Sequence, residues 1–168
     1  MNDTDRTAGF RHLTPEVMLD AVEKASGIPM TGLTIPLPSY INRVYELQSR
    51  AGERLIAKFY RPNRWSRAAL EDEHRFLADC AEEEIPVVSP LKLADGNTLG
   101  RSDDGYFALF PRKAGREFEL NTGEDLVRVG RLVARIHLAG ERRDGNHGTP
   151  SRDSRSSFSR RVDRSRGR

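Results

Sequence analysis

A lysine in one apolar strand and a glutamate in the helix that follows are the two residues whose placement points to chemistry. Lys58 lies in the segment LIAKFY, where the alternation of side chains puts it on the same face as Ile56. Glu73 follows in a helical pattern between Leu70 and Leu77, so it is expected to face the sheet. An ammonium oriented by a carboxylate, beside an apolar side chain, could hold phosphate oxygens while the apolar side chain covers adenine. The spacing by itself also fits an ordinary strand charge and a solvated helix residue.

The elements that must position this pair can be read on either side of it. Thr14 as N-cap and Pro15 at the first position begin a helix that Gly27 ends. Apolar segments then predict three strands, with a hairpin between the last two, at residues 33–37, 44–48 and 55–60.

Glu73 belongs to a long helix that Ser66 caps and that runs to about residue 84. Two further strands are predicted at residues 91–94 and 105–110, with a turn-rich segment between them, and a last helix at 124–139. This order predicts an α+β fold, an antiparallel sheet of about five strands with a packed helix.

The basic charge of the chain is concentrated at its end. The net charge is +3, but residues 149–168 hold seven Arg and two Asp, so the first 148 residues carry a net charge of −2. Those last twenty residues include one Val and one Phe as their only apolar side chains, so we expect a disordered Arg/Ser-rich tail. A tail without a partner is the expectation; non-specific contact with nucleic acid or lipid is the alternative.

Several classes of protein are excluded by composition. Cys80 is the one cysteine, which rules out a disulfide framework and a cysteine-based zinc site. No window of eighteen uncharged apolar residues is present, so no membrane span is expected, and the first twenty residues lack the apolar core of a secretory signal. A cytoplasmic protein is therefore expected.

Six segments in unbroken order carry a family resemblance over residues 10–147. They read PSYINRVYEL, KFYRPNRW, EDEHRFL, EEEIPVVSPL, GYFALFPRKAGREFE and VGRLVARIHLAG. The chain resembles the stress response kinase A (RdoA-type) family of bacterial Ser/Thr protein kinases, within the aminoglycoside phosphotransferase (choline kinase-like) group. The resemblance implies an N-terminal arm at 1–12, a kinase-like small lobe at 13–111, and a hinge with the start of a truncated large lobe at 112–148, followed by the tail.

The resemblance also implies a set of ATP-binding residues in the small lobe. Ser39 matches the serine of the phosphate-covering loop, and Asn42 stands there as a substitute for glycine that tolerates left-handed backbone geometry. Val44 matches the apolar residue above adenine, and Lys58 with Glu73 match the phosphate lysine and its partner. The hinge, whose backbone would read the adenine edge, is expected at Phe110, Pro111 and Arg112.

The catalytic half of the family pattern is missing. The family's H-G-D-x-H-x-x-N loop and its D-x-D-D metal segment, which supply the catalytic base and the magnesium ligands, do not occur, and His147-Gly148 is followed by Thr149. An Arg/Ser run in place of core-forming sequence suggests a truncated or frameshifted kinase chain, inactive alone. The expected ligands are ATP, magnesium and a protein substrate; the alternative is a non-catalytic nucleotide-binding or scaffold remnant.

Overall fold

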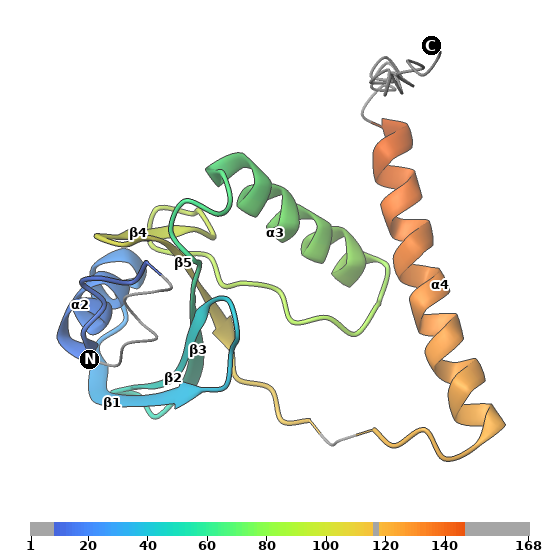
Figure 1. The fold of residues 1–168 in the computed structure, drawn as a ribbon, viewed down its shortest axis with the longest axis horizontal. Helices are drawn as coiled ribbons and strands as arrows, with labels where there is room; N and C mark the ends of the chain where they lie inside the picture. Colours follow the sequence, from blue (N-terminus) through green and yellow to red (C-terminus); the bar gives the residue numbers. More distant parts are fainter. Residues whose placement is uncertain (1–8, 116–117, 147–168) are drawn as a thin grey trace, which may run out of the picture.

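Five antiparallel strands form one sheet in the order β1-β2-β3-β5-β4, with helices on both faces (Figure 1). The computed structural model describes residues 9–115 and 118–146, with side chains described as far as 142. The strands are β1 Met30–Leu37, β2 Arg43–Ser49, β3 Arg54–Phe59, β4 Gly100–Ser102 and β5 Gly105–Pro111. The helices are α2 Pro15–Ser26, α3 Arg67–Glu82 and α4 Gly123–Asn146.

Helix α2 covers one face of the sheet. The Thr14 hydroxyl accepts a hydrogen bond from the Val17 N–H at its start, and Gly27 ends it in the left-handed conformation, as predicted. Met18 and Val22 are buried against the sheet. The main core lies here; its buried members are Phe10, Met18, Val22, Met30, Leu47, Leu55, Ala57, Phe59, Leu93, Phe107 and Leu109.

Helix α3 covers the opposite face. The Ser66 hydroxyl accepts from the Ala69 N–H, which confirms the predicted cap. Leu70 packs in a second core cluster with Tyr60 and Ala108. Side chains alternate along β3, and Leu55, Ala57 and Phe59 pack under α2. Ile56 and Lys58 therefore face α3.

Helix α4 contacts the C-terminal end of α3 rather than the sheet (Figure 1). Cys80 and Ile85 pack against Ala139 of α4, and Arg142 pairs with Glu83. None of the described helices is long and apolar enough to cross a membrane.

Three sequence-based boundaries differ most from the structure. Residues 91–94 form no strand; Leu91 donates one backbone hydrogen bond to Leu109, and the chain then turns at Gly96. The short strand β4 follows that turn instead, because Leu91 and Leu93 are drawn into the core by their side chains. Strand β1 begins at Met30 and α4 reaches Asn146, both longer than predicted. The Arg/Ser-rich tail lies outside the described residues.

Candidate functional site

Lys58 and Glu73 form an ion pair between the sheet and α3. Lys58 Nζ lies 2.9 Å from Glu73 Oε1, as their predicted facing requires. The pair is partly open to solvent, with side-chain exposures of 26% for the lysine and 43% for the glutamate. The ammonium is therefore oriented but still reachable by an anion.

An apolar surface adjoins the ammonium on the same face of the sheet. Val44 of β2 lies directly opposite Lys58, and Phe110 of β5 lies directly opposite Ile56. Residues directly opposite each other in antiparallel strands share a face, so Val44, Ile56 and Phe110 lie on the same face as the lysine, toward α3. This surface has the composition needed to cover an aromatic base.

The loop between β1 and β2 lies at the lysine end of this surface, because Val44 follows it closely and pairs with Lys58. Ser39 is exposed in this loop. Asn42 does not use the left-handed geometry that an asparagine tolerates, because positive φ among non-glycine residues is confined to Asn63 and Glu84 within the described chain. Asn42 instead accepts a hydrogen bond from the Arg61 N–H through its side-chain oxygen, at 3.2 Å, which ties the loop to the end of β3.

The backbone of the predicted hinge is partly engaged within the sheet. The Arg112 N–H donates to the Arg54 carbonyl at 3.1 Å, so these two residues form a hydrogen-bonded pair. Two residues along the register, Phe110 lies opposite Ile56 and belongs to the same hydrogen-bonded set. The carbonyl of Pro111 between them therefore points away from β3.

A buried carboxylate that the sequence reasoning missed joins β2 to Arg112, the residue that follows β5. Glu46 Oε1 lies 2.6 Å from the Arg54 guanidinium, and its Oε2 lies 3.0 Å from that of Arg112. The hydrogen bond from Arg54, supported by Arg112, lowers the pKa of Glu46 although burial opposes it. Strand alternation from Val44 to Glu46 could have placed this acid on the same face as Lys58.

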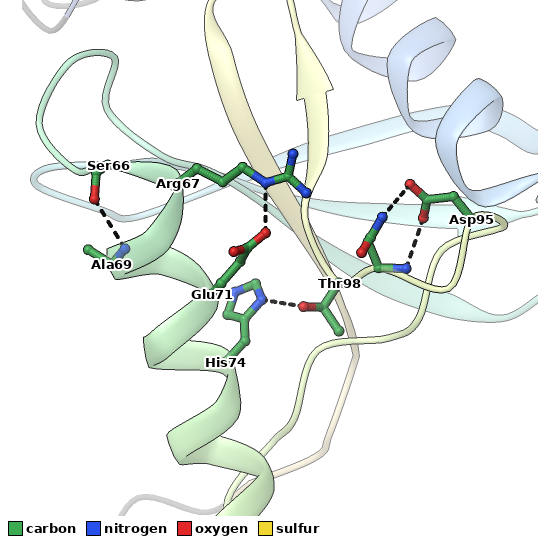
Figure 2. A network of polar contacts seen from close by, with 8 residues as sticks. Ser66, Arg67, Ala69, Glu71, His74, Asp95 and Thr98 are labelled. Atoms are coloured by element: carbon green, nitrogen blue, oxygen red, sulfur yellow. Dashed lines mark hydrogen bonds and ion pairs between the residues drawn. The ribbon is translucent and has the colours of Figure 1, made fainter. Parts of the chain in front are cut away.

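A buried polar chain beside the ion pair was also missed. The Tyr60 hydroxyl lies 2.8 Å from His74 Nε2. On the other side of the ring, His74 Nδ1 lies 2.7 Å from the Thr98 hydroxyl, a contact drawn in Figure 2. Burial lowers the pKa of His74 and raises that of Tyr60, with the Glu73 charge adding to the rise for Tyr60. The helical spacing of His74 from Leu70 and Leu77 was the signal that could have placed it on the packed face.

No three His, Cys, Asp or Glu side chains gather as a metal-binding group in the part of the chain that the structure describes. The acids at the site, Glu46 and Glu73, are each committed to basic side chains. We therefore assign neither of these residues as a magnesium ligand.

The chain is similar to known kinases over most of its length. The chain is 39% identical over 143 residues to a serine/threonine protein kinase RdoA of Salmonella typhimurium, and 38% identical over 133 residues to a stress response kinase A of Escherichia coli K12. These matches cover 85% and 79% of the chain, and 42% and 40% of the relatives. The chain thus spans about two fifths of the length of these curated relatives.

A solved structure shows the same fold. An amicoumacin kinase, hAmiN, in complex with AMP-PNP, Ca²⁺ and Ami, superposes with a TM-score of 0.65 at 18% identity. The match covers 82% of this chain and 42% of the kinase. The fold is therefore that of a kinase-like small lobe, as the sequence predicted. Residues 34–166, most of the chain, match the phosphotransferase enzyme family, and the chain belongs to that family.

Proposed function

We propose that this chain is the nucleotide-binding lobe of an ATP-dependent phosphotransferase that acts on Ser/Thr hydroxyls of proteins. The observation that carries the proposal is the Lys58–Glu73 pair, 2.9 Å apart and partly open, beside an apolar surface on the same face of the sheet. Phosphoryl transfer depends on positioning and on neutralising phosphate charge, and an oriented ammonium contributes to both. The protein substrate is proposed from the likeness to the RdoA-type relatives.

In the proposed complex, adenine lies over Val44 and Ile56 and its edge meets the hinge. The Pro111 carbonyl, which points away from β3, would accept from the exocyclic amine, and the Lys113 N–H two residues on would donate to a ring nitrogen. Lys58 would hold phosphate oxygens, with the loop that contains Ser39 above them. The structurally similar kinase hAmiN is in complex with AMP-PNP, which is consistent with this use of the fold.

The catalytic step needs groups that this sequence does not contain. Without the catalytic loop and the metal segment of the family pattern, a base for the acceptor hydroxyl and ligands for magnesium have no assigned residues here. For this reason a second candidate function is a lobe that binds nucleotide, or scaffolds a partner, without transferring phosphate. If that lobe binds nucleotide, the same small-lobe residues would hold it.

Calorimetric titration with magnesium-ATP tests the nucleotide site. We expect weak binding to the wild-type chain and none to Lys58→Ala, because the phosphate charge then has no ammonium beside it. Lys24→Ala is the matched control, since Lys24 pairs with Asp20 on α2, across the sheet from the site. Absence of binding to the wild type, or equal binding to Lys58→Ala, would refute the proposal. Phosphate transfer to a generic protein substrate, lost in Lys58→Ala, would overturn the non-catalytic alternative.

A further inference from the structure

We propose that Tyr60, His74 and Thr98 form a positioning relay, a chain of contacts that fixes the position of the Lys58 ammonium and the rotation of α3 relative to the sheet. The relay concerns only the position of the Lys58 side chain. The use of that ammonium to bind phosphate rests on the function proposed above. None of the three residues belongs to the nucleotide-binding set derived from the sequence.

The first link is the contact between Lys58 and the ring of Tyr60. Lys58 Nζ lies 4.5 Å from the centroid of that ring, within the range of a cation–π interaction. Tyr60 follows Lys58 by two residues, so both side chains lie on the face toward α3. The ammonium is therefore held from two sides, by the carboxylate of Glu73 and by the ring. A flexible lysine held at one point keeps several rotamers, whereas two contacts select few of them.

The second link joins this ring to α3. Tyr60 is only 3% exposed, and its hydroxyl is bonded to His74 Nε2 at 2.8 Å. His74 is the residue after Glu73, so one turn of α3 carries both the partner of the lysine and the partner of the ring. Rotation of α3 that withdrew Glu73 would also break the buried bond to Tyr60. The bond thus opposes loss of the ion pair at a site where solvent cannot replace it.

The third link fixes His74 from the far side of its ring. Its Nδ1 is bonded to the hydroxyl of Thr98, which follows a turn closed by hydrogen bonds from Asn97 to Asp95 (Figure 2). Burial lowers the pKa of His74 below its ordinary 6.5, so at pH 7 the neutral form predominates, with one nitrogen donating and the other accepting. Each hydroxyl can serve either role, so both tautomers leave every polar atom of the relay paired.

Lysine NMR with ¹³Cε-labelled lysine reads the position of Lys58 directly. The sequence contains four lysines, Lys24, Lys58, Lys92 and Lys113, so the spectrum is simple and Lys58→Arg assigns the signal. The other three are exposed and serve as internal references. We expect the Lys58 ε-protons to be shifted upfield of the references, because the side chain lies over the Tyr60 ring.

Two substitutions then cut the relay without removing the lysine, the glutamate or the ring. Tyr60→Phe deletes only the hydroxyl, and Thr98→Val replaces the far hydroxyl with a methyl group. Each is expected to reduce the upfield shift about twofold or more, because the ring is no longer anchored. Val22→Ala is the matched control: it opens a cavity under α2 on the opposite face of the sheet and should leave the Lys58 signal unchanged.

The outcomes separate this proposal from the proposed function. An unshifted Lys58 signal in the wild type, a full shift retained in folded Tyr60→Phe or Thr98→Val, or an equal loss in Val22→Ala would each overturn the relay. If Tyr60→Phe does not fold, Thr98→Val decides. A magnesium-ATP titration of the same samples tests the function independently: absence of binding refutes the nucleotide site while the lysine shift still decides the relay.

Discussion

The Lys58–Glu73 ion pair is expected to contribute little to the stability of the fold, although it lies at the centre of the proposed site. The perturbation that tests this is Glu73→Gln, which keeps the size of the side chain and a hydrogen-bonding oxygen but removes the charge. Lys58→Met and the double variant complete a mutant cycle, so that the interaction between the two residues is isolated from their other contacts.

The magnitude follows from the exposure of the pair. With the side chains 26% and 43% exposed, water screens the attraction, and pairs of this kind contribute about 0.2–1 kcal/mol. For a chain of this size, a change of 1 kcal/mol in the free energy of unfolding corresponds to a change in Tm of about 2–4 °C. By contrast, Met18 is 1% exposed, and Met18→Ala should cost about 2–5 kcal/mol through lost burial and a residual cavity.

Urea denaturation followed by circular dichroism measures all four members of the cycle, with Met18→Ala as the reference for a true core loss. We expect a coupling free energy of about 1 kcal/mol or less between Lys58 and Glu73. A coupling energy of about 3 kcal/mol or more, or a loss in Glu73→Gln equal to that in Met18→Ala, would refute the reasoning. The pair would then be a buried structural contact, and the ammonium would not be free to engage an anion.

Two further predictions concern packing and pH. Gly100→Ala should destabilise the fold by about 1–3 kcal/mol, because its Cβ would lie 2.3 Å from the ring of Phe107, which is fully buried; Gly115→Ala, with open space around it, should be neutral in the same thermal melts. Burial holds the pKa of His74 below its ordinary 6.5, so the unfolded chain binds that proton more readily. The contribution of neutral His74 to the free energy of unfolding should therefore be fully present above pH 6.5 and should decline as the pH falls from 6.5 toward the lower folded-state pKa. Equal urea midpoints at about pH 7.5 and about pH 5.5 would contradict this.

Local signals in the sequence determined most of the elements and the central pair of the site. Thr14 and Ser66 cap their helices as predicted, because a capping hydroxyl acts on an N–H three residues away. Lys58 and Glu73 meet because each lies on a face set by its own element, a strand of period 2 and a helix of period 3.6. Helix caps and the face on which a side chain lies depend on residues nearby in the chain, so they can be predicted from the sequence.

Contacts between distant segments were decided only by the tertiary structure. Residues 91–94 have the composition of a strand, but Leu91 and Leu93 pack into the core. Residues 100–102 form the edge strand of the sheet instead. Asn42 was placed as a substitute for glycine that tolerates left-handed geometry, yet its side chain accepts a hydrogen bond from the backbone of Arg61, nineteen residues away. No period in the sequence encodes such a pairing.

The surroundings of the lysine were decided in the same way. The Tyr60–His74 and His74–Thr98 bonds span 14 and 24 residues and join the end of β3, α3 and the segment before β4. Glu46 pairs with one arginine from β3 and with another that follows β5. A buried polar group must find a partner, but which partner it finds depends on how the sheet and α3 pack together. The sequence therefore determined that Lys58 and Glu73 could meet, and the packing of α3 on the sheet decided what holds them there.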